Sequence, residues 1–440
     1  MSAHRRLLWG LALGSLAAAG SAAGMTRGAA GPGTAAGPAP RTDAEIRELD
    51  IGFYRARAGR DPHGASDRAH LARLYLQRAR ETGDFGDLVR AEASARESLA
   101  IRRGRNGAAY AVLAASLMSQ HRFPEALDAA SHLLGLDSAA VGTRALVAEI
   151  ELELGRYEEA GRKFGALRLR RADPAVAPRL ARWEELRGRP EEARALLREA
   201  RARLRRMHGV PAEQLAWLQL RLADLALRHG RLAEADAELE AGLALAPDDY
   251  RLLAAGARLA LARGEPGRAR LLGERAIGRS LEPGTLGLLH DAAEMEGDST
   301  AAAQYDRAMT AAVLAQPGPL HRGWSMYLLD HGREAGTVLE RARAELRARR
   351  DVYGWDLLAW ALHHAGRYAE AEAAMRHALA LGTRDASIEY HAGMIARAAG
   401  DTAGARRHLA AALRINRFWH PVQPLSARAV LDTLAGSAGR

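Results

Sequence analysis

Apolar and small residues recur every three or four positions along most of this chain, and short polar stretches interrupt them at regular intervals. This spacing places the apolar side chains on one face of an α-helix, whereas no stretch shows the period of two that is typical of a strand. The pattern is clearest over residues 352–385, where two amphipathic segments share an apolar face made of Trp355, Leu358, Ala359, Leu362, Ala371, Met375 and Ala378. The chain is therefore predicted to be all-α, with essentially no sheet.

Small residues in this stretch indicate a helical hairpin. Two antiparallel helices cross closely only where side chains are small, so we expect Ala359 and Ala371 to face each other at the crossing. Gly366 lies between the two segments. It ends the first helix because glycine adopts the left-handed backbone conformation at little cost.

The same turn recurs at intervals of about 34 residues, which indicates repeats of one unit. A small residue follows each turn glycine five positions later, in the pairs Gly155 with Ala160, Gly188 with Ala193, Gly230 with Ala235, Gly264 with Ala269, Gly366 with Ala371 and Gly400 with Ala405. His121 takes the place of the glycine before Ala126. Because a chain built on one period forms a single elongated body, we expect a solenoid of about ten helical hairpins.

These units resemble the tetratricopeptide repeat family over roughly residues 67–415. Stretches such as DVYGWDLLAWAL also resemble a group of exported bacterial repeat proteins. The resemblance implies a right-handed α-α superhelix in which the first helix of each hairpin lines a concave groove. It also implies that this groove binds a peptide segment or a domain of a partner protein.

The two ends of the chain differ from the repeats. Residues 1–23 have the basic start, apolar middle and small-residue end of a secretory signal peptide, although the apolar run approaches the length of a membrane anchor. Residues 24–41 form a linker rich in Pro, Gly and Ala. The solenoid then covers residues 42–440, with an N-terminal cap helix starting at Thr42 and a C-terminal cap at about 416–435. We expect an exported protein, periplasmic or extracytoplasmic, with an inner-membrane anchor and a chain that is not exported as the alternatives.

Charge and composition narrow the function classes. The formal net charge is +10, and Lys163 is the only lysine, so the surplus consists of arginine. Either genome composition accounts for it, or guanidinium groups bind an anionic partner. Glutamates interleave with arginines over residues 190–206, which is typical of a solvated helix face and not of a nucleic-acid site.

Motifs that carry chemistry are missing from the sequence. Cysteine is absent, so the chain forms neither a disulfide nor a thiolate metal site. The sequence also contains no phosphate-binding loop and no nucleophile elbow. We therefore expect no enzyme activity, no cofactor and no nucleic-acid partner.

When each first helix is aligned with the tetratricopeptide repeat family, the resemblance predicts which side chains point into the groove. In the middle of the chain these are Glu149, Glu153, Arg182, Glu185, Trp217, Arg221, Asp224, Arg228, Arg251, Arg258, Asp291 and Glu294. In the C-terminal third they are Arg322, Asp330, Tyr353, Asp356, Trp360, His363, His364, Tyr390, His391 and Arg397. Because aromatic residues and arginine dominate binding hot spots, we predict that the C-terminal set binds the partner. The alternative is that Trp360 and Tyr353 pack between adjacent repeats.

Histidines of the C-terminal set allow a second interpretation. His364 and His391 can form a two-histidine, one-carboxylate metal site with Asp356 or Asp330, although no metal-binding motif supports it. The predicted function is therefore a non-catalytic scaffold that binds a protein or peptide partner in the bacterial cell envelope. The alternatives are a binder of anionic envelope polymer and a metal or ligand sensor that depends on His363, His364 and His391.

Overall fold

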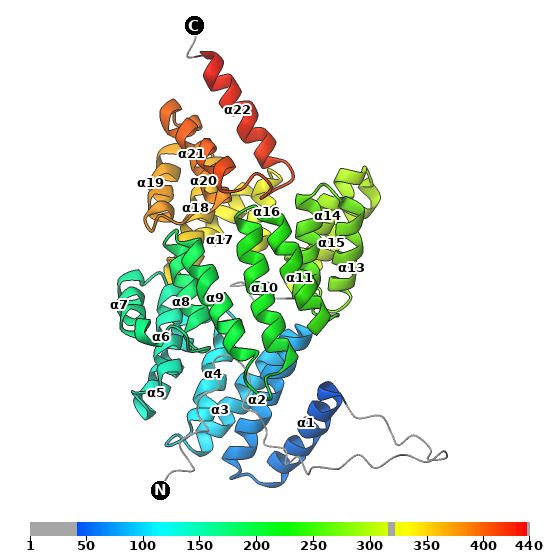
Figure 1. Ribbon diagram of the computed structural model, residues 1–440, viewed down its shortest axis with the longest axis vertical. Helices are drawn as coiled ribbons and strands as arrows, with labels where there is room; N and C mark the ends of the chain where they lie inside the picture. Colours follow the sequence, from blue (N-terminus) through cyan, green and yellow to red (C-terminus); the bar gives the residue numbers. More distant parts are fainter. Residues whose placement is uncertain (1–41, 316–321, 438–440) are drawn as a thin grey trace, which may run out of the picture.

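A computed structural model describes residues 42–315 and 322–437 (Figure 1). Every regular element in these two ranges is a helix, which confirms the all-α prediction for the described part of the chain. The signal peptide predicted at 1–23 and the linker predicted at 24–41 lie outside the described residues.

Within the described residues, ten helical hairpins follow one another between two single helices, which confirms the predicted α-helical solenoid of about ten hairpins. The single helices are α1 (Asp43–Arg60) and α22 (Gln423–Ser437). The hairpins are α2 (Ala65–Thr82) with α3 (Phe85–Ile101), α4 (Gly107–Ser119) with α5 (Phe123–Leu136), α6 (Val141–Glu153) with α7 (Tyr157–Leu167), α8 (Ala177–Leu186) with α9 (Pro190–Leu204), α10 (Ala212–Arg228) with α11 (Leu232–Leu245), α12 (Tyr250–Ala262) with α13 (Pro266–Ile277), α14 (Pro283–Glu296) with α15 (Ser299–Leu314), α16 (Arg322–Asp330) with α17 (Ala335–Ala348), α18 (Val352–His364) with α19 (Tyr368–Leu379) and α20 (Ala386–Ala398) with α21 (Thr402–Ile415). A short 3₁₀ helix, η1 (Arg168–Arg170), follows α7.

The turns inside the hairpins have the conformation that the sequence predicts. Gly366 has φ 72° between α18 and α19, and the turn glycines of the other predicted pairs also have positive φ. His121 adopts φ 57° in the turn between α4 and α5, so it replaces glycine in conformation as well as in position. Ala359 and Ala371 are fully buried, as expected for small residues at a helix crossing.

Successive turns of the superhelix stack directly on one another. The hydroxyl of Tyr157 in α7 accepts a 2.7 Å hydrogen bond from the backbone N–H of Val352, which lies 195 residues later. Thr383 donates a 2.6 Å hydrogen bond to the carbonyl of Leu186, and Asn416 donates one of 2.9 Å to the carbonyl of Leu227. Each contact joins a residue near the turn of one hairpin to a residue in or next to a loop. This loop follows the fifth hairpin further along the chain. In Figure 1 the C-terminal hairpins α18 to α21 accordingly lie beside α6 and α8.

This stacking closes the concave groove into an interior. Val352 and Tyr353 of α18 share an apolar core with residues of α6, α8 and α10 from the preceding superhelical turn. The guanidinium of Arg182 in α8 lies 5.3 Å from the centre of the Tyr353 ring, so a cation–π contact also crosses between the turns. The first helices therefore face protein on two sides.

Gly188→Ala tests the stacking. Gly188 (φ 69°) and Gly366 (φ 72°) are both left-handed, so alanine at either position costs about 1–2 kcal/mol. At Gly188 the added methyl also overlaps the carbonyl oxygen of Gly382 in the next superhelical turn, whereas at Gly366 nothing lies within 4 Å. We expect Gly188→Ala to lower the free energy of unfolding by about 1–3 kcal/mol more than the control Gly366→Ala. Urea unfolding measures the difference, and equal losses would show that the turns do not stack there.

Candidate functional site

First helices line the inside of the superhelix and leave cavities there. One of these, the N-terminal cavity, has a volume of about 430 Å³ and is walled by α2, α4, α6, α8, α10 and α12. Its lining side chains are Arg80, Ala115, Met118, Ser119, Leu146, Glu149, Glu153, Pro178, Arg179, Arg182, Glu213, Gln214, Trp217, Arg221 and Arg251. Every even-numbered helix from α2 to α12 contributes, so the cavity is a stretch of the repeat groove.

A second space, the C-terminal cavity, has a volume of about 450 Å³. It lies among α10, α12, α14, α16 and the start of α20, and residues 416–421 close one side of it. Its polar lining consists of Arg228, Arg258, Asp291, Tyr327, Asp330, His331, Asp385, Ser387, Asn416, Trp419 and His420.

Most of the middle groove set predicted from the sequence lines a cavity, whereas Glu185 is buried beside the cavities and Glu294 is exposed. Glu149, Glu153, Arg182, Trp217, Arg221 and Arg251 line the N-terminal cavity, and Arg228, Arg258 and Asp291 line the C-terminal cavity. Sequence reasoning missed Arg80, Arg179 and Glu213 in the N-terminal cavity. Arg80 belongs to a degenerate first repeat, in which the small-residue signal that sets the frame is weak.

Positive charge exceeds negative charge on the wall of the N-terminal cavity, with five arginines against three glutamates. Arg251 pairs with Glu213 at 3.1 Å and Arg179 pairs with Glu149 at 2.7 Å. No carboxylate among the described residues lies within ion-pair distance of Arg80. Burial lowers the pKa of the Arg80 guanidinium, and the nearby guanidinium of Arg251 lowers it further against the opposing effect of Glu213. The wall is therefore suited to an anionic group.

The buried carboxylate of Glu185 forms ion pairs with three guanidinium groups next to the N-terminal cavity. Glu185 lies 2.7 Å from Arg228, 3.2 Å from Arg182 and 3.8 Å from Arg221. Burial acts to raise the pKa of Glu185, but the guanidinium groups of Arg228, Arg182 and Arg221 outweigh it and lower this pKa to about 2. Glu185 therefore stays ionised, and the cluster keeps a positive surplus in the interior.

The aromatic part of the C-terminal set is buried. The exposed fraction is 5% for Trp360, 6% for Tyr390, 3% for Asp356 and 1% for His391. Trp360 stacks on His391 with ring centres 4.3 Å apart, and its indole N–H donates a 3.1 Å hydrogen bond to Asp330. The expectation that these four side chains face an open groove is wrong, because α18 and α20 pack against each other and against the closing C-terminal segment. Trp360 instead packs between adjacent repeats, which is the alternative stated in the sequence analysis.

The other members of the C-terminal set are scattered over several environments. Arg322 pairs with Asp351 at 2.9 Å and with Glu345, and so ties α16 to α17 and α18. Asp330 lines the C-terminal cavity, where it also accepts a 2.9 Å hydrogen bond from Gln423. Tyr353 lies under Arg182, His363 is half-buried, and His364 and Arg397 are exposed. A role of this set in partner binding stays a prediction.

The predicted metal site on His364 and His391 does not form. His391 donates a 2.8 Å hydrogen bond from Nδ1 to Asp356, and its Nε2 lies 4.0 Å from Asp330. Within residues 42–315 and 322–437, the histidine and carboxylate group close enough to hold an ion consists instead of His290, Asp291 and His331. Asp291 was in the predicted groove set, but nothing in the sequence linked it to His331, which follows 40 residues later.

Comparison with known families decides the type of repeat. Residues 352–381, which span α18 and α19, match the family model described as Tetratricopeptide repeat. Residues 352–381 are therefore a tetratricopeptide repeat. No curated protein matches it.

Solved structures similar to this chain have low sequence identity to it. The Cut9–Hcn1 hetero-tetramer of APC/C has 13% identity and a TM-score of 0.35, with 89% of this chain and 94% of that chain covered. A tetratricopeptide repeat protein from Parabacteroides merdae has 17% identity and a TM-score of 0.37, with 55% and 93% covered. The type IV pilus biogenesis factor PilW has 18% identity and a TM-score of 0.32, with 56% and 92% covered.

None of the helices within 42–315 and 322–437 combines the length and the apolar character that a membrane span requires.

Glu185→Gln tests the buried charge cluster. Because the folded pKa of Glu185, about 2, lies below its ordinary value of 4.5, the ion pairs stabilise the fold above pH 4.5 and lose this effect as the pH falls toward 2. We expect Glu185→Gln to lower the free energy of unfolding at neutral pH by about 3 kcal/mol. The difference between variant and wild type shrinks as the pH approaches 2.

Glu125→Gln is the matched control, since Glu125 also pairs with an arginine but its side chain is 50% exposed. Its loss should stay below about 1 kcal/mol. Urea unfolding at several pH values measures both variants, and a loss for Glu185→Gln as small as that of the control would contradict the assignment.

Proposed function

We propose that this tetratricopeptide repeat protein is a non-catalytic scaffold that binds an anionic peptide segment of a partner protein in the N-terminal cavity. The observation that carries the proposal is the surplus of guanidinium groups on the cavity wall, with Arg80 unpaired among the described residues. A guanidinium binds a carboxylate through two parallel hydrogen bonds, so a carboxylate of the partner supplies the missing counter-charge.

A peptide explains the apolar part of the wall as well. Met118, Leu146, Pro178 and Trp217 lie among the charged side chains of the same cavity. Pockets that combine apolar surface with a few polar groups are typical of sites for small ligands and short segments, and about 430 Å³ is within their usual size. A partner recognised by charge alone has no need for such a wall.

Ion pairing on the outer helices weakens the case for an anionic polymer as the partner. On α9, Arg194 and Arg198 pair with Glu234 of α11 at 3.0 and 2.9 Å. These ion pairs reduce the positive charge that α9 presents to a polymer. We place the scaffold in the bacterial cell envelope on the strength of the signal-like residues 1–23, with the possibility of an anchor in the inner membrane through the same segment.

The proposal is tested by capture from native envelope extract with residues 25–440 as bait. The double variant Arg80→Gln, Arg221→Gln removes two positive charges from the cavity wall. The matched control, Arg268→Gln with Arg343→Gln, removes two from α13 and α17, where each arginine pairs with a glutamate of its own hairpin. We expect wild type and control to retain the same partner and the cavity variant to lose it, with circular dichroism confirming that all three are folded.

Salt dependence separates the two kinds of anionic partner. A peptide held by apolar contacts as well as charge stays bound when NaCl rises from about 0.1 M to about 0.5 M, whereas a polymer held by charge alone is released. Equal retention by all three baits would place the partner outside the N-terminal cavity. Retention of no protein by any bait would contradict the scaffold proposal.

A further inference from the structure

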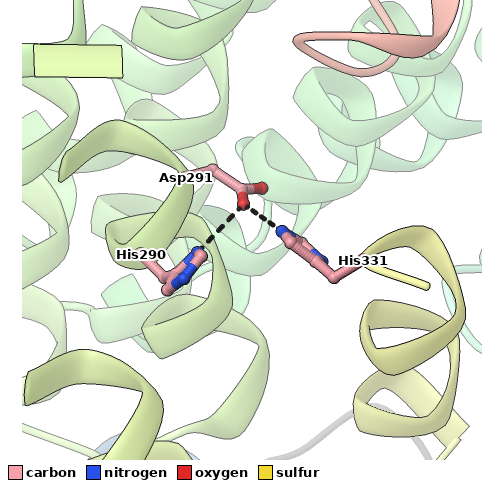
Figure 2. Close-up of side chains that lie close together, drawn as sticks. All are labelled: His290, Asp291 and His331. Carbon is pink, nitrogen blue, oxygen red and sulfur yellow. Dashed lines mark hydrogen bonds and ion pairs between the residues drawn. The ribbon is translucent and has the colours of Figure 1, made fainter. Parts of the chain in front are cut away.

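Two imidazoles and a carboxylate meet between the second half of α14 and the C-terminal end of α16. Figure 2 shows His290 and His331 on either side of Asp291, with both rings directed toward its carboxylate. His331 Nε2 lies 3.0 Å from Asp291 Oδ1, and His290 Nδ1 lies 3.5 Å from the same oxygen. All three potential ligand atoms lie within 4.8 Å of one another. The three side chains are partly buried, and they join hairpin α14–α15 to hairpin α16–α17.

The hydrogen bond on the far side of His331 fixes its tautomer. Its Nδ1 lies 2.8 Å from the backbone carbonyl oxygen of Tyr327, which can only accept, so Nδ1 carries a proton. In the neutral ring, Nε2 then presents a lone pair to the carboxylate of Asp291, which is also an acceptor. Two acceptors 3.0 Å apart require a positive species between them, either a second proton on the ring or a metal ion.

This arrangement is that of a metal-binding histidine. Such a histidine typically donates its other ring N–H to a backbone carbonyl or carboxylate, which orients the ring and makes the free nitrogen a better ligand. An ion held at about 2.1 Å by nitrogen and oxygen separates neighbouring ligand atoms by about 3.0–3.4 Å. The distances of 3.0 and 3.5 Å are close to this range. Because the three potential ligand atoms lie within 4.8 Å of one another, binding to one ion requires the imidazoles to rotate.

One side of the site opens into the C-terminal cavity. Asp291 and His331 line this cavity, and so do Asp330 and His420. Asp330 adds negative charge, which favours a cation. His420 accepts hydrogen bonds at Nδ1 from the backbone N–H groups of Val422, at 3.1 Å, and Gln423, at 3.3 Å. The proton of neutral His420 is therefore on Nε2, so this residue is a hydrogen-bond donor to the cavity and not a fourth ligand.

We propose that His290, Asp291 and His331 bind one divalent transition-metal ion, with positions left open toward the C-terminal cavity. Two imidazoles with one carboxylate suit zinc and the neighbouring first-row ions. This site is separate from the N-terminal cavity, so the proposal does not depend on the identity of the protein partner. A ligand that enters the C-terminal cavity can occupy the open positions.

The test uses the full chain without a histidine tag, freed of metal by a chelator that is then removed. Zn²⁺ titrated in a calorimeter should bind with a stoichiometry of one, and Co²⁺ should give the visible absorption of an ion with nitrogen and oxygen ligands. His331→Gln and, separately, Asp291→Asn should each weaken Zn²⁺ binding by at least about tenfold. Asp291→Asn keeps the size of the side chain, so it remains informative if His331→Gln fails to fold.

The matched control is His208→Gln, which removes an exposed histidine outside the cluster. It should leave Zn²⁺ affinity and stoichiometry unchanged. Absence of stoichiometric binding to the wild-type chain, or equal affinity in all variants, would overturn the proposal and leave a protonated His331 paired with Asp291 as the state of the cluster. Loss of metal binding with partner capture intact would separate this site from the proposed scaffold function.

Discussion

The interior of this protein depends on the contact between one superhelical turn and the next. At Gly188 the backbone of one turn approaches Gly382 of the following turn so closely that no side chain fits between them, and the buried hydroxyl of Thr383 reaches the carbonyl of Leu186 beside it. Backbone approach of this kind needs glycine at the turn, which the repeat already places there to end each first helix. The residue that terminates a helix thus also sets the distance between superhelical turns.

Closure changes the electrostatics of the groove. Arginines that an open groove would leave in water lie in an interior where an unpaired charge is costly, so most of them are paired. Three of them share Glu185, which stays ionised only because Arg228, Arg182 and Arg221 surround it. The surplus that remains, at Arg80 and around Glu185, is the basis of our proposal that the interior binds an anionic group of a partner.

Closure also divides the groove into two different environments. The N-terminal cavity has five arginines and three glutamates, whereas the C-terminal cavity has two arginines, three aspartates and two histidines. The two cavities therefore differ in charge, which agrees with the proposals of an anionic segment in the first and a cation beside the second. The C-terminal segment takes part in this division, because Gln423 bonds to Asp330 and Trp419 lines the cavity.

The sequence by itself determined the helical period, the left-handed turns, the small residues at the crossings and, in the middle of the chain, which side chains face inward. These features depend on contacts within one repeat or between neighbours, and a periodic pattern records such contacts directly. Tertiary structure alone decided that Trp360 and His391 are buried, that no carboxylate among the described residues forms an ion pair with Arg80, and that His331 meets Asp291. The small rotation between repeats accumulates along the chain, so residues almost two hundred positions apart come together. No local sequence pattern predicts these contacts.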